Sequence, residues 1–296
     1  MLETPAPETA TTASHDVFAP ARRSAPVILA SPHSGTDYPG DFVAASKLDL
    51  LSLRRSEDSF VDELFANGPA HGLPLLRARF PRAYIDPNRE PFELDPAMFE
   101  DALPEYANTR SSRVAAGLGT IARVVSSGQD IYAGKLKFAD AAERINRHYR
   151  PYHRSLRHLL AETRKAFGGF FLIDCHSMPS IGGPYDPDAG RQRADIILGD
   201  CFGNACGAHL AVLVSECFAD MGYSVERNRP FAGGFTTRHY GRPREGLHAL
   251  QIEINRGLYM DEDKIRPTDG LETLKADIDR LLTMLGGIRA ADLRPG

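Results

Sequence analysis

The sequence is poor in cysteine, with only four cysteines among its 296 residues. They are Cys175, Cys201, Cys206 and Cys217, and no two of them form a Cys-x-x-Cys pair. This spacing is typical of reduced thiols and argues against a disulfide framework or a structural zinc site built on cysteine pairs. Because free thiols persist in a reducing compartment, we expect a cytoplasmic protein.

Long hydrophobic runs are absent as well. Residues 210–214 form one of the longest, and this run is far shorter than the roughly 20 residues that span a bilayer. The first fifteen residues lack the basic start and the apolar stretch of a secretory signal. We therefore expect no membrane contact, a disordered tail over residues 1–15 and a single α/β domain over residues 16–296.

The sequence also lacks an excess of positive charge. Its 35 Lys and Arg are outnumbered by 39 Asp and Glu, which gives a net charge of -4, and no long basic block occurs. A nucleic-acid partner is therefore not expected. There is no Gly-x-Gly-x-x-Gly segment, no P-loop and no Gly-x-Ser-x-Gly elbow. Dinucleotide-binding, nucleotide-binding and serine-hydrolase functions thus lack their key residues.

Short apolar runs alternate with segments of helical periodicity along the chain. Strands and shorter extended pieces are predicted at residues 26–30, 75–80, 83–86, 169–174, 195–198, 223–226 and 249–255. Helices are predicted from Ser56 onward and at residues 114–125, 139–167, 205–221 and 271–285. Because proline lacks the amide hydrogen, Pro151 should kink or divide the longest of these helices.

This alternation predicts an α/β fold of three layers, in which a mainly parallel or mixed sheet carries helices on both faces. Sheets of this kind bind ligands beyond the carboxyl ends of their strands. Residues 181–193, rich in Gly, Pro and Asp, should form a surface loop over that edge.

Two histidines, His33 and His176, each directly follow a predicted strand. Two imidazoles and one carboxylate form a typical open zinc site with a position left for water. Glu57 and Asp58 are candidates for the carboxylate, and Asp174 could orient an imidazole. The alternatives are that the two acids only complement a helix dipole and that each histidine is an ordinary hydrogen-bonded residue.

Residues 250–255 alternate strictly between apolar and polar side chains. Gln251, Glu253 and Asn255 therefore share one face of the predicted strand. In a sheet covered on both sides, the carboxylate of Glu253 would be desolvated, and its pKa would rise toward a range useful for proton transfer. The alternative is an edge strand whose polar face is in contact with water.

Two further segments carry cations in unusual backbone surroundings. Prolines flank Asn88 and Arg89, and a guanidinium held in this way can bind a carboxylate through two hydrogen bonds. A structural salt bridge is the alternative for Arg89. Residues 231–241 combine glycines with Arg238, which is typical either of a binding loop or of a surface hairpin.

Taken together, these residues resemble the N-formylglutamate amidohydrolase family, whose fold is related to those of zinc carboxypeptidases and aspartoacylases. The resemblance covers about residues 26–259. Its marks are Ser-Pro-His33-Ser-Gly, Asp58 with Val61 and Asp62, Ile-Asp86-Pro-Asn88-Arg89, Pro151-Tyr-His153, Asp174-Cys-His176-Ser, Gly233-Gly with Thr237-Arg238-His-Tyr-Gly241, and Gln251-Ile-Glu253.

One segment departs from the family pattern. Members that act in histidine breakdown carry Asp-Thr-Asp-Trp-His where this chain has Ser56-Glu-Asp-Ser-Phe60. Only the middle acid is kept, which favours Asp58 over Glu57 as a metal ligand.

The resemblance implies a zinc-exopeptidase-like fold and a metal-dependent amidohydrolase. The expected substrate is a small N-acyl amino acid, N-formyl-L-glutamate, which would be cleaved to glutamate and formate. The alternatives are a carboxypeptidase-like or deacylating hydrolase with another N-acyl amino acid or peptide as substrate, and a binding protein without turnover.

The resemblance also implies roles for individual residues. One divalent ion, expected to be Zn²⁺, would be held by His33, Asp58 and His176. Glu253 would act as the general base and Arg82 would stabilise the oxyanion. The residues expected to bind the carboxylates of the substrate are Asn88, Arg89 and Arg238.

Overall fold

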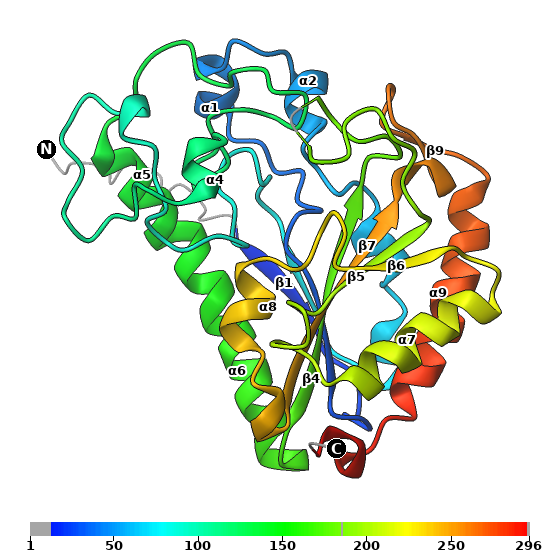
Figure 1. Cartoon of the computed structure of the whole chain (residues 1–296). Helices are drawn as coiled ribbons and strands as arrows, with labels where there is room; N and C mark the ends of the chain where they lie inside the picture. The colour runs from blue at the N-terminus through cyan, green and yellow to red at the C-terminus, as the bar shows by residue number, and fades with distance from the viewer. Residues whose placement is uncertain (1–12, 185, 295–296) are drawn as a thin grey trace, which may run out of the picture.

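The computed structural model describes residues 13–184 and 186–294 and contains a seven-stranded sheet with the strand order β1-β3-β2-β4-β7-β5-β6 (Figure 1). Its strands are β1 (His15–Phe18), β2 (Val27–Ser31), β3 (Leu75–Ala78), β4 (Phe170–Met178), β5 (Ile196–Gly199), β6 (Val225–Arg227) and β7 (Leu247–Asn255). The pairs β2–β3, β2–β4, β4–β7 and β5–β6 are parallel. The pairs β1–β3 and β5–β7 are antiparallel, so the sheet is mixed, as expected. A separate two-stranded sheet joins β8 (Met260–Asp261) and β9 (Arg266–Pro267).

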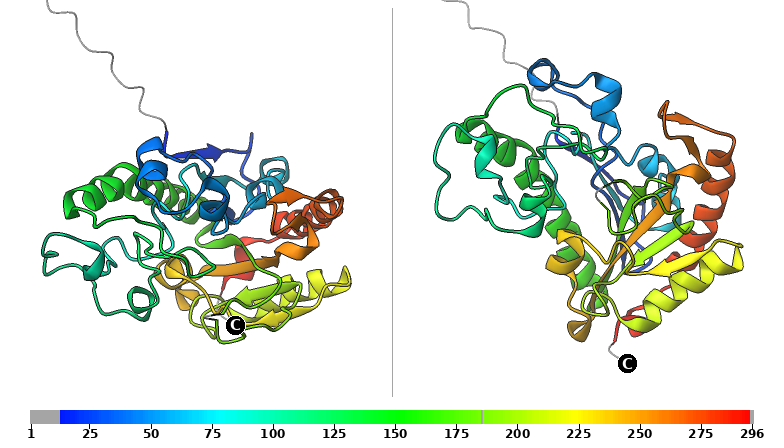
Figure 2. Two further views of the ribbon diagram at one scale, coloured as in Figure 1. Left: turned by 90° about the horizontal axis from the view of Figure 1, so that it is seen from above. Right: turned by 45° about the horizontal axis from the view of Figure 1, so that its top comes forward.

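Helices cover both faces of the sheet, which confirms the predicted three layers. They are α1 (Gly40–Ala45), α2 (Leu50–Arg54), α3 (Val61–Leu64), α4 (Ser112–Ala115), α5 (Phe138–Arg144), α6 (Arg150–Phe167), α7 (Ala208–Asp220), α8 (Phe235–Tyr240) and α9 (Gly270–Gly286). The long helix α6 packs on one face, whereas α7 and α9 pack on the other (Figures 1 and 2). None of the helices within the described residues combines the length and the apolar composition that a membrane span requires.

The central strands β4 and β7 change character along their length. On the side of α6, Leu172 and Ala249 are paired in register and belong to the hydrophobic core. Further along the same face, apolar side chains give way to Asp174, His176 and Glu253. The opposite face of both strands is mainly apolar beneath α7 and α9, with Phe171, Ile173, Leu250 and Ile252 in the hydrophobic core. A polar site therefore opens on one face only, near the carboxyl ends of these strands.

Two predicted elements are wrong. Residues 114–125 do not form a helix, because α4 ends at Ala115 and Gly117 adopts a left-handed conformation with φ +75° that breaks the helical path. The remainder of that segment is a loop. Residues 83–86 are not extended, since the backbone turns at Arg82–Tyr84 and the amide of Tyr84 donates to the carbonyl of Pro81.

The predicted division of the long helix takes the form of a π-helical turn. The π-helix η3 (Ile145–Tyr149) joins α5 to α6, and Pro151 lies in the first turn of α6. The amide of Arg150 donates to the carbonyl of Ile145, five residues earlier. The π-turn thus rearranges the hydrogen-bond ladder just before a residue that cannot donate.

The predicted boundary between the N-terminal tail and the domain also needs correction. Residues 1–12 of the expected tail lie outside the described residues, and His15 already begins β1. All four cysteines are free thiols, as expected.

Candidate active site

The structure brings His33 and His176 together at one edge of the sheet, with their ring centroids 4.8 Å apart. His33 lies two residues beyond the end of β2. The strand predicted to end at Asp174 runs on to Met178, so His176 lies within β4 rather than after it. Because β2 and β4 are parallel neighbours, their carboxyl ends lie side by side, which explains the meeting of the two rings.

Asp58 completes this cluster from a loop, not from a helix. The helix expected to begin at Ser56 begins only at Val61, after Phe60 in a left-handed conformation with φ 67°. The acids at positions 57 and 58 therefore precede the helix, and the proposal that they complement its dipole is wrong. Oδ2 of Asp58 lies 2.9 Å from Nδ1 of His176.

Glu57 is bound elsewhere. Its carboxylate accepts hydrogen bonds from Tyr38, Arg54 and Ser59. These three donors occupy both of its oxygens. Of the two adjacent acids, only Asp58 faces the histidines.

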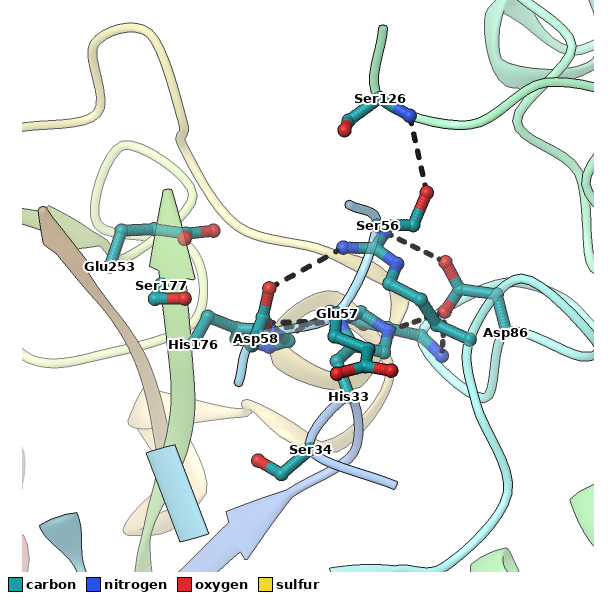
Figure 3. A network of polar contacts seen from close by, with 12 residues as sticks. His33, Ser34, Ser56, Glu57, Asp58, Asp86, Ser126, His176, Ser177 and Glu253 are labelled. Atoms are coloured by element: carbon teal, nitrogen blue, oxygen red, sulfur yellow. Dashed lines mark hydrogen bonds and ion pairs between the residues drawn. The ribbon is translucent and has the colours of Figure 1, made fainter. Parts of the chain in front are cut away.

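Three potential ligand atoms converge at one point, as Figure 3 shows. Nδ1 of His33 lies 3.1 Å from Nδ1 of His176 and 3.3 Å from Oδ2 of Asp58. A zinc ion with bonds of about 2.0–2.1 Å holds tetrahedral ligands roughly 3.3 Å apart. All three residues are at most 2% exposed. The spacing therefore fits one small cation.

The surroundings of the two rings strengthen this interpretation. Nε2 of His33 lies 2.7 Å from Asp86, and Nε2 of His176 lies 3.0 Å from Asp174. Each carboxylate favours a proton on the Nε2 that faces it, which leaves the lone pair on Nδ1 directed into the cluster. Two lone pairs and a carboxylate oxygen in contact repel one another unless a cation lies between them. The donor set thus fits a divalent metal ion.

Arg256 holds Asp58 in place, and sequence reasoning missed it. Its Nη2 donates to Oδ1 of Asp58 over 3.0 Å, and its Nε donates to Ser177 over 3.1 Å. Oδ2 of Asp58 remains directed at the histidines. Burial alone would raise the pKa of Asp58, but the imidazoles of His176 and His33 beside it hold that pKa well below its usual range. The signal in the sequence is that Arg256 directly follows the end of β7, the kind of position that also identified the two histidines.

Asp86 has a comparable role toward His33. Besides the imidazole, it accepts a hydrogen bond of 2.9 Å from Nη2 of Arg82 and one of 2.8 Å from the backbone amide of Asn88. Burial would raise the pKa of Asp86, but the adjacent imidazole of His33 and the charges of Arg89 and Arg82 hold that pKa well below its usual range. Asp86 is therefore an ionised partner that orients His33.

Glu253 lies next to the cluster on the neighbouring strand. β7 pairs with β4 on one side and with β5 on the other, so the edge-strand alternative is wrong. Glu253 is paired in register with His176 and is only 8% exposed. Oε1 of Glu253 accepts a hydrogen bond from Gln251. Burial raises the pKa of Glu253 to about 7, so this carboxylate can both accept and release a proton near neutral pH.

A cavity of about 420 Å³ opens above His33, His176 and Glu253. This size lies within the range of small-molecule sites. Loops from distant parts of the chain form its walls, among them the predicted loop at residues 181–193 and residues 230–234 just before α8. The cavity gives the polar cluster access to a small ligand.

The predicted carboxylate-binding residues all line this cavity, but they differ in how firmly they are held. The side chain of Asn88 accepts from the backbone amide of Thr236. Arg89 donates to the carbonyls of Leu118 and Asn88, and its Nη2 lies 3.7 Å from Asp86. Burial lowers the pKa of Arg89 to about 10. Arg238 lies on α8, where its side chain is exposed.

Replacing Arg256 by methionine should weaken zinc binding by about 10- to 100-fold, the usual effect of losing a group that orients a metal ligand. Asp58 would lose the hydrogen bond that turns Oδ2 toward the histidines. A zinc titration in competition with a chelator measures the change. The exposed Arg266→Met variant serves as the control, and equal zinc affinity in the two variants would contradict this role of Arg256.

Comparisons with known proteins agree on one family. The sequence profile of a family described as N-formylglutamate amidohydrolase matches residues 25–260. The N-formylglutamate deformylase of Pseudomonas aeruginosa is 30% identical over 272 residues, which cover 89% of this chain and 94% of that protein. The N-formylglutamate deformylase of Pseudomonas putida is 30% identical over 243 residues, which cover 80% of this chain and 82% of that protein.

Solved structures give the same result. The crystal structure of an N-formylglutamate amidohydrolase from Ralstonia eutropha is similar with a TM-score of 0.84 and 38% identity, covering 92% of this chain and 96% of that one. A gene product from Agrobacterium tumefaciens, 21% identical with a TM-score of 0.62, shares the fold. With the profile match and the curated relatives, this shows that the chain belongs to the N-formylglutamate amidohydrolase family.

Proposed function

We propose that the protein hydrolyses the amide bond of an N-acyl amino acid, with N-formylglutamate as its substrate, and that it uses a divalent ion held by His33, Asp58 and His176. The observation that carries this proposal is the convergence of three potential ligand atoms, two of them from residues that line the cavity together with Glu253. Family membership supports the same activity, because the relatives are named N-formylglutamate deformylases.

Zinc is the proposed ion, since two imidazoles and one carboxylate with an open position are typical of zinc hydrolases. When bound, such an ion polarises the scissile carbonyl and makes water a better nucleophile.

Glu253 is the proposed general base. It takes a proton from the attacking water, whose oxygen joins the formyl carbon, and delivers that proton to the amide nitrogen as the carbon–nitrogen bond breaks. The products are formate and the free amino acid. A pKa of about 7 suits both halves of this transfer, and the pairing of Glu253 in register with His176, one of the proposed ligands, supports this role.

Arg82 is the proposed stabiliser of the oxyanion. Its Nη2 is anchored by Asp86, and its Nη1 lies 3.9 Å from Oδ1 of Asp58. The guanidinium thus lines the cavity directly beside the ligand cluster, where negative charge develops on the carbonyl oxygen. Asn88, Arg89 and Arg238 are the proposed ligands of the carboxylates.

Replacing Arg82 by methionine should lower kcat by about 10²-fold, because a preorganised cation at an oxyanion contributes mainly in the transition state. The KM should change much less. Steady-state kinetics of the zinc-loaded variant measure both values. A large rise in KM at unchanged kcat would show instead that Arg82 binds the substrate in its ground state.

The activity itself is tested by measuring formate or acyl release from a panel of N-acyl amino acids and a short peptide. The panel contains N-formylglutamate, N-acetylglutamate, N-formylglutamine and N-formylleucine. We expect the zinc-loaded protein to release formate fastest from N-formylglutamate. Tight binding of these compounds without any release would contradict the proposal and favour a binding protein, and faster cleavage of the peptide would favour a carboxypeptidase-like enzyme.

A further inference from the structure

Arginine dominates the charged groups of the cavity. The six that line it are Arg82, Arg89, Arg113, Arg193, Arg238 and Arg256. Four of them have acidic partners within 4 Å. Arg82 and Arg89 pair with Asp86, Arg193 pairs with Asp186 and Asp188, and Arg256 pairs with Asp58. Within residues 13–184 and 186–294, neither Arg113 nor Arg238 forms an ion pair or a side-chain hydrogen bond. Among the described residues, Arg113 and Arg238 are therefore the two arginines of the cavity without a direct acidic partner.

Arg113 was not among the residues that the sequence singled out. It lies on α4 and is half-buried, whereas Arg238 is more exposed on α8. Burial lowers the pKa of Arg113, and the nearby charge of Arg238 lowers it further. Two guanidiniums that share a cavity wall repel each other until an anion binds between them. An anionic group of the ligand would remove this repulsion.

We propose that Arg113 and Arg238 together bind the side-chain carboxylate of the substrate and so select acidic N-acyl amino acids. This inference rests on the proposed hydrolysis of such compounds. It adds Arg113 to the site, and it assigns one carboxylate to a pair of arginines.

The contacts of Arg89 are the reason for assigning the side-chain carboxylate to Arg113 and Arg238 instead. Arg89 lies 3.7 Å from Asp86, which in turn contacts the ligand residue His33. Arg89 is thus already held beside an acidic group of the site, and we assign to it the α-carboxylate, which every N-acyl amino acid carries. The second carboxylate of a glutamate derivative is several bonds away, and the cations left for it are Arg113 and Arg238.

The test compares kcat/KM for N-formylglutamate and N-formylglutamine, which differ only in this carboxylate. In the zinc-loaded Arg113→Met variant, the preference for N-formylglutamate should fall by about 10- to 100-fold, since a two-pronged hydrogen bond between charged groups is lost. Arg238→Met should also reduce the preference. The double variant should lose less than the product of the two single effects, because both residues bind one carboxylate.

Arg110→Met is the matched control, since Arg110 lies three residues before Arg113, is exposed and does not line the cavity. It should keep the preference of the wild type. An unchanged preference in Arg113→Met, or an equal loss on both substrates, would overturn the inference. Should Arg113→Met fail to fold, Arg113→Lys keeps the charge but loses the two-pronged geometry and should show a smaller fall in the same ratio.

Calorimetry separates this inference from the proposed reaction. L-Glutamate should bind the wild type more tightly than L-glutamine, and Arg113→Met should remove most of that difference whether or not the protein turns over substrate. If the wild type cleaves neither formyl compound but Arg113→Met still removes the difference in binding, only the proposed hydrolysis is contradicted. Equal binding of both amino acids by the wild type would overturn the inference about Arg113.

Discussion

Replacing Glu253 by glutamine is expected to lower kcat by about 10²-fold or more, the scale of losing a positioned proton carrier. Glutamine has nearly the same shape but cannot accept the proton of the attacking water. Glu253 is not one of the three converging ligand residues, so bound zinc should remain at wild-type occupancy. The substrate should also bind with unchanged affinity. Single-turnover kinetics and elemental analysis of the same sample measure both consequences.

Glu57→Gln is the matched control for this variant, because Glu57 is likewise a buried carboxylate, and its partners are Tyr38, Arg54 and Ser59. It should keep the turnover of the wild type. Activity near wild type in Glu253→Gln would leave the proposed mechanism without its base. Loss of zinc from Glu253→Gln would instead make Glu253 a ligand.

Removing either histidine of the cluster is expected to abolish both zinc binding and turnover. In His33→Ala or His176→Ala, one of three protein ligands is lost, and most of the metal affinity should go with it. Prolonged dialysis of the wild type against a chelator should likewise remove activity, and added zinc should restore it. Elemental analysis of each protein, together with its circular dichroism spectrum, distinguishes lost metal from lost fold.

The control is His148→Ala. His148 is a histidine of η3 that packs against Phe80 and Tyr84. It lies outside the cluster and should keep full zinc occupancy. Full occupancy in both His33→Ala and His176→Ala would refute the assignment of the site.

The two acids at the loop before α3 allow a finer comparison. Asp58→Asn should lose most of the bound zinc, because the neutral amide replaces the carboxylate that contacts both histidines. Glu57→Gln should retain it. The same zinc titration with both variants decides between the two neighbours, and similar small effects would mean that neither acid is a ligand.

The residues whose positions in the fold could be predicted are those with a recognisable pattern in the sequence immediately around them. His33 and His176 stand at or near the ends of apolar strands, and the strict alternation around Glu253 fixes the face on which it lies. Strand pairing then brings these positions together, because neighbouring parallel strands end at the same edge. The scaffold of the site could therefore be predicted from apolar runs and their last residues.

The parts that the sequence did not predict depend on contacts between distant segments. Apolar residues at 114–125 suggested a helix, but Gly117 turns the chain and the segment becomes a wall of the cavity. Arg113 directly precedes this segment, and its role could be inferred only once α8 was seen to bring Arg238 to the same cavity. Arg256 is similar, since nothing in the local sequence connects it with Asp58, almost 200 positions earlier.

The most direct test of the account is the position of the metal ion in a crystal of the zinc-loaded protein, located by anomalous diffraction at the zinc edge. We predict one strong peak in contact with Nδ1 of His33, Nδ1 of His176 and Oδ2 of Asp58. The expected distance to each atom is about 2.0–2.2 Å. A peak bound to other residues, or no peak here after saturation with zinc, would contradict the central claim that these three side chains form the metal site.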